Sequence, residues 1–426
     1  MGFCYGKLQM PCNSAASISL KKKLQVQSLL KRLNKTPQKS IKSPDGDIID
    51  CIPISHQPAF DHPLLQNHKI QLAPSYYPEG RFDDKKVNSL KSSEGLKPIK
   101  QLWHLNGNCA EGTIPVRRTK KDDVLRAGAI KNFGKKKKNN ILRPNSTQHQ
   151  DCLCRTKKHQ VILMRISGRT CITLWGRVSS QHAIAFVEGD KYFGARAYIN
   201  VWQPKVEKPA EFSVSQISVT AGDVNSIQAG WMVSHKLYGD NNTRLFNFWT
   251  RDAFKSTGCY NLLCSGFVQI SHRIALGACI APISSYNGAQ YDIGILLWRD
   301  PNGGNWWMKY GNDNEVVGYW PASLFTNLAD GADMIQWGGQ VVDIVSDGQH
   351  TTTQMGSGHF PAEGFSKAAY FKNIQVVTNG SNQLMDPHDV DALTDQNGCY
   401  DIEFGKSTHG GFFFYYGGPG RNPNCP

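Results

Sequence analysis

Ala183-Ile-Ala-Phe-Val187 alternates small and large apolar side chains, which is typical of a β-strand with two differently packed faces. Apolar residues recur with the same period of two in residues 246–250 and 293–297. Clusters of glycine and asparagine, at 239–242 and 302–304, separate such segments. Many short strands divided by turns predict an all-β fold, a sandwich or a barrel, for the second part of the chain.

The chain has 426 residues and a net charge of +14, with lysine runs at 21–23 and 135–138. A basic excess can attract nucleic acid. No nucleic-acid module and no interleaved aromatic residues accompany these lysines, so we expect a solvated basic segment and no nucleic-acid partner. No apolar stretch reaches the roughly 18 residues of a transmembrane helix, so we expect no membrane span.

The first part of the chain differs from the second in its pattern of apolar residues. Residues 18–34 are predicted to form one amphipathic helix, because apolar residues from Val26 to Leu33 recur at helical spacing, and the helix should end before Pro37. Residues 48–72 are short apolar pieces interrupted by prolines, too few to build a core of their own. We therefore predict a small, mostly irregular segment with one helix, which packs on another part of the protein.

The 12 cysteines are many for a reducing compartment. Metal binding is the alternative to disulfides, but no CxxC occurs and Cys152-Leu-Cys154 lacks a matching partner pair, so no metal site is expected. The predicted disulfides are Cys51–Cys109, Cys259–Cys264 and Cys399–Cys425.

Three sequons agree with an extracellular, glycosylated protein, at Asn145, Asn241 and Asn379. Residues 1–20 have no sustained apolar core, so a signal peptide is not evident. Two explanations stay open: the true start lies upstream, or the chain has lost its targeting.

Several longer motifs are similar to those of one family. They include Ser43-Pro-Asp-Gly-Asp-Ile-Ile-Asp-Cys51, Glu111-Gly-Thr-Ile-Pro-Val-Arg-Arg118, Gly258-Cys-Tyr-Asn-Leu-Leu-Cys264, His350-Thr-Thr-Thr-Gln-Met-Gly-Ser-Gly-His-Phe360 and Tyr416-Gly-Gly-Pro-Gly420. The chain resembles the plant neprosins, secreted glutamic peptidases that cut next to proline. The resemblance implies an antiparallel β-sandwich peptidase domain and a zymogen whose N-terminal segment masks the cleft.

The resemblance also sets expected boundaries. We expect a poorly defined N-terminus at 1–23, an activation-peptide-like segment at 24–127, a basic linker or insertion at 128–180 and the peptidase-like domain at 181–426. Within the linker, Val161 to Met164 could form a stray strand, and the exposed lysines near 135–138 are the expected place for processing.

Two motifs correspond to the family's active-site stretches, Asn225-Ser-Ile-Gln-Ala-Gly-Trp231 and Ile335-Gln-Trp-Gly-Gly-Gln-Val341. The resemblance puts the catalytic glutamates at positions 228 and 340, and this chain has Gln228 and Gln340 there. Peptide hydrolysis by a carboxyl pair needs one group to accept a proton and another to donate one. Glutamine keeps the shape of glutamate but cannot exchange a proton near neutral pH. Gln336 removes a third carboxylate that often stands at this neighbouring place in the family.

Three hypotheses follow. The first is an inactive or impaired peptidase homologue that binds proline-containing peptides. The second is an active peptidase in which another acid has taken over, the candidates being Asp223, Asp333, Asp343 and Glu363. The third is a polysaccharide-binding β-sandwich, which would need exposed aromatic residues among Trp231, Trp306, Trp307, Trp320 and Trp337.

The remaining expectations concern the cleft and its partners. Besides the two glutamines, the expected cleft residues are Trp231, Gln336, Trp337, His350 and Gln354. The expected partners are a peptide or protein, which could be rich in proline, and the chain's own N-terminal segment as a mask over the cleft. No cofactor is expected.

Overall fold

The computed structural model describes residues 13–80, 100–136, 178–311, 315–345, 348–378, 383–405 and 411–426, with side chains from residue 20 onward. The predictions for Asn145, Asn379, the strand at Val161 to Met164 and the Cys152–Cys154 pair therefore lie outside the described residues. Within the described part of the chain, no helix is both long enough and apolar enough to cross a membrane.

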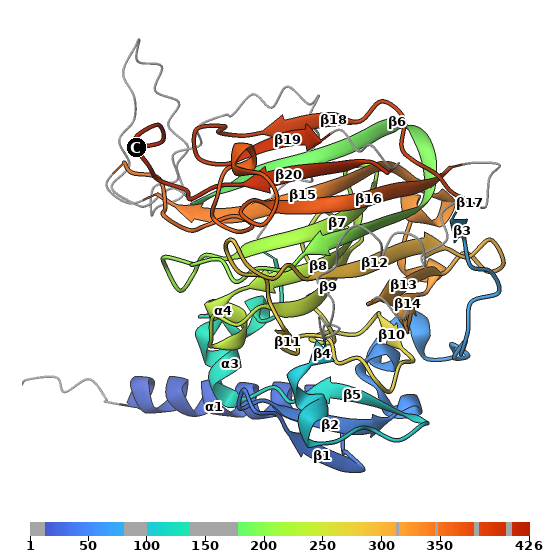
Figure 1. Ribbon diagram of the computed structural model, residues 1–426. Helices are drawn as coiled ribbons and strands as arrows, with labels where there is room; N and C mark the ends of the chain where they lie inside the picture. The colour runs from blue at the N-terminus through green and yellow to red at the C-terminus, as the bar shows by residue number, and fades with distance from the viewer. Residues whose placement is uncertain are drawn as a thin grey trace, which may run out of the picture.

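One antiparallel sheet of 13 strands forms the β domain, and its hydrogen-bonding pattern divides it into two halves that share the long strand β6 (Figure 1). The first half runs in the order β18 (Asp391–Thr394), β6 (Val178–Asn200), β15 (Ala332–Ile344), β7 (Ser213–Ala221), β8 (Asn225–Val233) and β9 (Arg244–Thr250). The second half runs in the order β19 (Asp401–Gly405), β20 (Phe413–Gly417), β16 (Ala369–Thr378), β6, β12 (Asp292–Arg299), β13 (Trp306–Tyr310), β14 (Glu315–Trp320) and β10 (Val268–Gln269).

Strand β6 joins the halves because its two ends pair with different neighbours. Residues 178–192 pair with β15, whereas residues 194–200 pair with β12. The main hydrophobic core lies between the two halves and takes side chains from both, among them Ile217, Trp231 and Trp337 from the first and Ile295, Trp306 and Phe371 from the second. The predicted all-β sandwich is confirmed.

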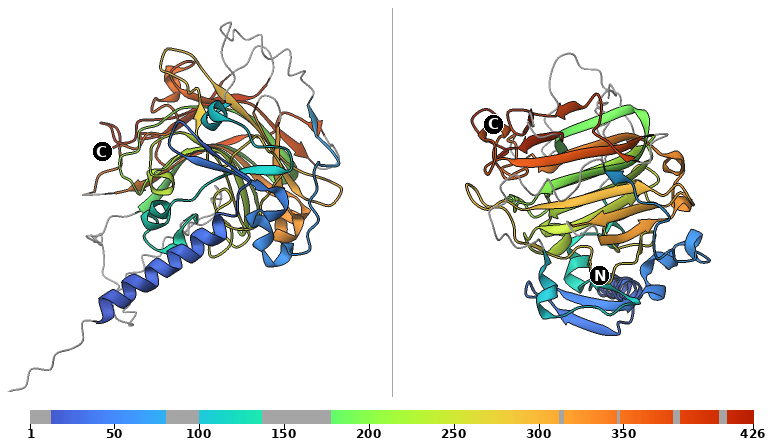
Figure 2. Two further views of the ribbon diagram at one scale, coloured as in Figure 1. Left: turned by 90° about the horizontal axis from the view of Figure 1, so that it is seen from below. Right: turned by 45° about the vertical axis from the view of Figure 1, so that its right-hand side comes forward.

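The N-terminal segment contains more regular structure than the sequence indicated. Its helix α1 spans Asn13–Leu33, close to the predicted 18–34, and buries Val26, Leu29 and Leu33. Figure 2 shows α1 projecting beyond the rest of the molecule at its N-terminal end. Three short strands form a separate sheet, β1 (Lys39–Lys42), β2 (Ile48–Pro53) and β5 (Thr113–Arg117), followed by α3 (Lys121–Arg126).

The remaining elements are short. The strands are β3 (Glu79–Gly80), β4 (Lys100–Gln101), β11 (Ile280–Ala281) and β17 (Gln383–Leu384), and α4 spans His235–Tyr238. The 3-10 helices are η1 (Ile54–His56), η2 (Pro58–Asp61), η3 (Pro63–Leu65), η4 (Leu102–Asn106), η5 (Ile130–Asn132), η6 (Ala322–Leu324), η7 (Asn327–Asp330) and η8 (Pro361–Glu363).

Buried glutamines attach the N-terminal segment to the β domain. The side chain of Gln57 donates to the carbonyl of Gln269 at 3.0 Å and accepts from its backbone N–H at 2.8 Å. Gln101 makes the same two bonds with Ala275, each of 2.7 Å. Each amide thus replaces a strand partner, and β4–β11 and β3–β17 add backbone pairing between the segment and the domain.

A buried group of charges lies at the same interface. Arg244 of β9 is fully buried and contacts Asp47 of the N-terminal segment and Asp240 of the domain, each at 2.5 Å. Asp45 lies 3.6 Å from the same guanidinium, and Arg117 of β5 lies 3.0 Å from Asp47. Segment and domain therefore share one ion-pair network.

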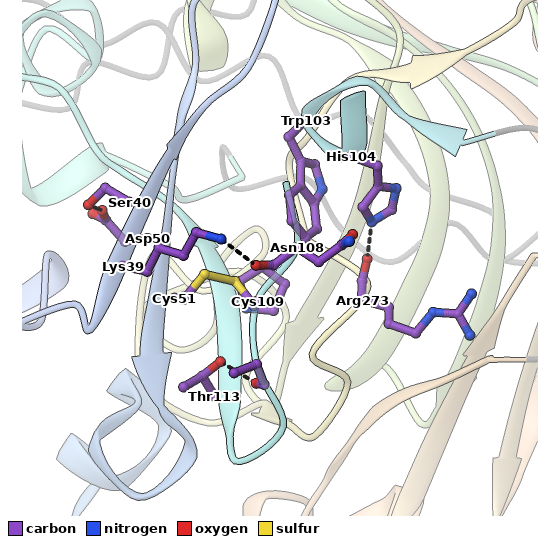
Figure 3. Close-up of a disulfide and its surroundings, with 12 residues drawn as sticks. Lys39, Ser40, Asp50, Cys51, Trp103, His104, Asn108, Cys109, Thr113 and Arg273 are labelled. Carbon is purple, nitrogen blue, oxygen red and sulfur yellow. Dashed lines mark hydrogen bonds between the residues drawn. A yellow bond between two sulfur atoms is a disulfide. The ribbon is translucent and has the colours of Figure 1, made fainter. Parts of the chain in front are cut away.

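All three predicted disulfides are present, with Cα–Cα distances of 5.4, 5.8 and 5.3 Å for Cys51–Cys109, Cys259–Cys264 and Cys399–Cys425. Figure 3 shows the first, which links β2 to the chain just before β5, beside the buried ring of Trp103. Cys279 is a buried free thiol, and burial raises its pKa to about 12.

Candidate functional site

Gln228 and Gln340 lie on the same face of the first half-sheet. Strand β7 runs between their strands, with Ser218 opposite Gln228 on β8 and Val214 opposite Gln340 on β15. Residues 214 and 218 are four apart and therefore point to the same side of the sheet. The opposite face of these strands packs in the main core. Two motifs more than a hundred residues apart thus place their glutamines on one surface, facing away from the core.

Lys136, the last described residue of the N-terminal segment before residue 178, lies between the two glutamines. Its Nζ donates to Oε1 of Gln228 at 3.0 Å and to Oε1 of Gln340 at 2.9 Å. Both distances are those of good hydrogen bonds. One amine therefore bridges the two amide oxygens.

The orientation of each amide is set by a serine on its far side. Nε2 of Gln340 donates to Oγ of Ser180 at 3.1 Å, and Nε2 of Gln228 donates to Oγ of Ser226 at 3.4 Å. Because the amide nitrogens are directed to hydroxyls, the two oxygens are directed to Lys136. The pair thus presents two hydrogen-bond acceptors.

Apolar rings surround the same amine. Nζ lies 5.9 Å from the ring centre of Phe248 and 5.5 Å from that of Phe254. Both rings belong to a hydrophobic cluster on this face of the sheet. Lys136 as a whole residue is half-buried, and its amine has an apolar and amide environment. This burial lowers the pKa of Lys136 to about 7.

Two further polar atoms on β7 complete the face between the glutamines. Oγ of Ser218 is buried and has no hydrogen-bond partner among the described residues, and neither has Oε1 of the neighbouring Gln216. Gln336 of β15 lies opposite Ser218, and its Nε2 contacts Sδ of Met334 at 3.6 Å. The site therefore retains unused hydrogen-bonding capacity beside the bridging amine.

The glycines before Gln340 are required by packing. A Cβ on Gly339 would lie 2.5 Å from Sδ of Met355 and 2.9 Å from the ring of Tyr416. Gly338 has a φ of +146°, which L side chains rarely adopt, and a Cβ there would collide with the carbonyl oxygen of Ala183. These contacts explain why the motif needs both glycines to carry Gln340 in a central strand.

Two family models match the chain. The Neprosin model matches residues 209–419 and the Neprosin activation peptide model matches residues 40–163. Together they cover most of the chain, including both glutamines and Lys136. The chain belongs to the neprosin family. Lys136 falls within the part matched by the activation peptide, so in this neprosin homologue the N-terminal segment itself covers the glutamine pair.

Solved structures give weaker likenesses. Scytalido-glutamic peptidase with a peptide-based transition state analogue is 12% identical, covering 57% of this chain and 100% of its own, with a TM-score of 0.31. SCP-B, a member of the Eqolisin family of peptidases, in complex with the tripeptide Ala-Ile-His is 12% identical, covering 56% of this chain and 98% of its own, with a TM-score of 0.30. At these TM-scores the likenesses add nothing to the assignment of the site.

The tryptophans of the two motifs do not line the site. Trp231 and Trp337 are fully buried in the main core, and Trp231 donates through Nε1 to the carbonyl of Asn200 at 2.9 Å. Each stands three residues from a glutamine on the same strand, and residues at an odd separation point to opposite faces. Their expected place in the cleft is therefore wrong. The other tryptophans considered for sugar binding are equally buried, at Trp306, Trp307 and Trp320.

Two other expected cleft residues have their contacts elsewhere. His350 is buried, with Nδ1 at 2.9 Å from the carbonyl of Thr351 and Nε2 at 3.7 Å from the carboxylate of Asp343. Gln354 accepts from the backbone N–H of Lys205 at 2.9 Å. Neither is hydrogen bonded to Gln228 or Gln340 within the described chain. Of the cleft residues predicted beside the glutamines, Gln336 alone shares their face of the sheet.

One group in the described chain has metal-ligand chemistry. Atoms of His350, Cys399 and Cys425 lie within 4.8 Å of one another. The two cysteines form a disulfide, so their sulfurs are not thiolate ligands. The group is therefore not suited to hold a metal ion in this state.

Lys136 is not among the site residues predicted from the sequence. The lysine run at 135–138 is expected to be a solvated linker, and for Lys136 that expectation is wrong. A run of four like residues carries no signal that one of them is buried.

Proposed function

We propose that this neprosin homologue is a catalytically impaired peptidase that binds proline-containing peptides on the sheet face of Gln228 and Gln340. The observation that carries the proposal is the amide pair bridged by Lys136, at the positions that the family resemblance gives to the catalytic carboxyls. Two amides and an amine provide hydrogen bonds at this point but no carboxyl group.

The chemical argument concerns proton transfer. A carboxyl pair can hold one proton and release another, and each such transfer contributes about 100- to 10,000-fold to a rate. An amide does neither near neutral pH. The loss of both groups therefore predicts a very low turnover, while the oriented amides and the Ser218 hydroxyl, which has no partner among the described residues, remain able to bind a peptide backbone.

The contacts of other acids support impaired catalysis over a substitute base. Asp333 accepts from the backbone of Gly222 at 2.8 Å, Asp343 accepts from that of Thr351 at 3.1 Å, and Glu363 pairs with His359 at 2.8 Å. The fourth candidate, Asp223, lies in the turn between β7 and β8 rather than in a strand beside the glutamines. Among the described residues, the side-chain partners of the glutamine pair are Lys136, Ser180 and Ser226.

The test compares full-length chains in cleavage of a proline-containing peptide across acidic and neutral pH, with products identified by mass spectrometry. The variants are the wild type, Lys136→Ala, Gln228→Glu with Gln340→Glu, and these three substitutions combined. Because Lys136 covers the pair, we expect the triple variant to cleave fastest and the wild type and Lys136→Ala to show background rates. Gln354→Glu is the matched control, since it adds a carboxylate away from the pair. Cleavage by Lys136→Ala at the rate of the triple variant would contradict impaired catalysis.

Binding is tested separately from cleavage. Lys136→Ala should bind the proline-containing peptide, measured by titration calorimetry, whereas the same peptide with alanine in place of proline should bind more weakly. Equal affinity for both peptides would contradict the proposed preference for proline.

The three disulfides support an extracellular, oxidising location. Asn241 is exposed and lies in a sequon, which makes it the expected glycosylation site within the described chain. Mass spectrometry of the native protein tests both points. Free thiols at Cys51 and Cys109, or an unmodified Asn241, would contradict the corresponding statement.

A further inference from the structure

We propose that the glutamine pair forms a receptor for the lysine side chain of a peptide ligand, and that Lys136 is its built-in occupant. The inference rests on the proposed function and adds the class of side chain that the site takes. Its basis is the set of contacts around Nζ, which together recognise a primary amine at the end of an aliphatic stem.

The acceptors match an amine. The oxygens of Gln228 and Gln340 are both directed to one nitrogen, at 3.0 and 2.9 Å. A primary amine has at least two N–H groups and can satisfy both oxygens at once. A proline ring has no side-chain donor, so a proline placed at this point would leave both oxygens unpaired, which is costly in a buried site.

The amides cannot readily turn to serve a different ligand. Their Nε2 atoms are occupied by Ser180 and Ser226. A carboxylate ligand would need those nitrogens as donors, so it would face two oxygens instead. The orientation of the pair therefore selects donors over acceptors.

The walls match the rest of a lysine side chain. The rings of Phe248 and Phe254 lie 5.9 and 5.5 Å from Nζ, within the range in which an aromatic ring attracts an amine that carries charge. They also provide apolar surface for the methylene stem. Beside them, Oγ of Ser218 has no partner in the described part of the chain and offers one further hydrogen-bonding group to a ligand.

The neutral pair also makes the occupant exchangeable. Neither glutamine compensates a positive charge, and burial lowers the pKa of Lys136 to about 7, so the charged amine is held poorly. A bound lysine from a peptide and the chain's own Lys136 would compete for the same two oxygens, because both amines can make the same hydrogen bonds.

The experiment uses the full-length Lys136→Ala chain, which vacates the amine position. Two otherwise identical tetrapeptides, each acetylated at its N-terminus only, are titrated by calorimetry. One has a central lysine with a free side-chain amine, and the other has norleucine, which has the same stem without the amine. We expect the lysine peptide to bind at least about tenfold more tightly than the norleucine peptide. The wild type should bind the lysine peptide more weakly than Lys136→Ala, because its own lysine competes. Adding Gln340→Leu to Lys136→Ala should remove the preference.

Equal affinity for the lysine and norleucine peptides would overturn this inference. The proline-containing peptide of the previous section separates the two proposals. If it binds and lysine gives no preference, the proposed function stands and the inference fails. If the lysine peptide binds and the proline peptide does not, the inference stands and the proline element fails.

A second measurement uses the wild type, so the test does not depend on the folding of a variant. Acetylation of lysines by an activated ester, followed by mass spectrometry, should find Lys136 protected relative to the exposed Lys135. With the reagent in excess over all amines, the lysine peptide should raise the labelling of Lys136 relative to that of Lys135, whereas the norleucine peptide should leave this ratio unchanged. Labelling that responds equally to both peptides would contradict displacement by an amine.

Discussion

Arg244 and Lys136 both lie between the N-terminal segment and the β domain, and their surroundings differ in one respect. Arg244 contacts the carboxylates of Asp47 and Asp240, whereas Lys136 contacts the neutral amides of Gln228 and Gln340. Burial opposes the charge of Arg244, but the hydrogen bond that Arg244 donates to Asp240 and the charges of Asp47 and Asp240 outweigh it and raise its pKa. Burial of Lys136 meets no such compensation, so its pKa falls to about 7.

The comparison shows that the glutamine substitutions change charge compensation at the site as well as catalysis. Carboxylate partners keep a buried cation charged at every physiological pH, so the Arg244 network acts as a permanent attachment of the segment. Amide partners accept hydrogen bonds from Lys136 but leave its charge uncompensated. The same segment is therefore fixed at one contact and exchangeable at the other.

The largest expected effect is at the fixed contact. Asp47→Ala removes the carboxylate that Arg244 and Arg117 share, and leaves these two buried guanidinium groups with fewer compensating partners. We expect a loss of about 3–5 kcal/mol in the free energy of unfolding, measured by denaturant titration at neutral pH. Asp122→Ala, an exposed aspartate on α3, is the control and should change stability by less than about 0.5 kcal/mol. A loss of under about 1 kcal/mol for Asp47→Ala would show that the network contributes little.

The second prediction concerns pH at the exchangeable contact. Unfolded Lys136 has its ordinary pKa of 10.5 and stays protonated up to that pH, whereas folded Lys136 releases its proton near pH 7. Between about pH 7 and 10.5 the unfolded state binds the extra proton, so the contribution of Lys136 to stability rises with pH and is lost as pH falls toward 7. Relative to Lys136→Met, the wild type should gain at most about 1.4 kcal/mol per pH unit in this window. If the free energy of unfolding changed with pH in the same way in both proteins, a lowered pKa of Lys136 would be contradicted.

The third prediction converts the exchangeable contact into a fixed one. Gln340→Glu places a carboxylate beside Lys136, which should raise the pKa of the lysine by at least about one unit, worth about 1.4 kcal/mol. The measurement is a pH titration of lysine side-chain carbons by NMR, with Lys136→Met identifying the resonance. Gln354→Glu is the control and should leave the titration unchanged. A shift of the same size in both variants would mean that the effect is not local to the pair.

The smallest effect should come from the serines that orient the amides. Ser180→Ala removes the acceptor for Nε2 of Gln340, and we expect a loss of about 0.5–1.5 kcal/mol in the free energy of unfolding. Ser226→Ala should cost less, because its contact with Gln228 is longer, 3.4 against 3.1 Å. Thermal unfolding of the two variants compares them directly. A larger loss for Ser226→Ala would contradict the assigned orientation of the pair.

Much of the fold could be predicted because it follows from local patterns. The alternation in Ala183–Val187 gives a strand, here part of β6, and the apolar spacing from Val26 to Leu33 gives the buried face of α1. The cysteine pairs were also predicted. The N-terminal sheet of β1, β2 and β5 was not, since its strands have only four to six residues and are interrupted by prolines and a long connection.

The candidate site was predicted only in part. The period of two places Trp231 and Trp337 on the face opposite the glutamines, since each is three residues away, so their adjacency in the motif does not put them in the same site. Lys136 could not be predicted in the same way. It is 92 residues from Gln228 and 204 from Gln340, and nothing in its neighbouring lysines marks it.

The sequence by itself determined the all-β fold, the family, the disulfides and the replacement of two carboxyl groups by amides. These follow from residue identity and from periods that covalent geometry imposes on neighbouring residues. Only the tertiary structure decided which cation meets which partner, carboxylates at Arg244 and amides at Lys136. Charge pairing depends on distances between remote segments, and those distances exist only once the N-terminal segment is packed against the sheet.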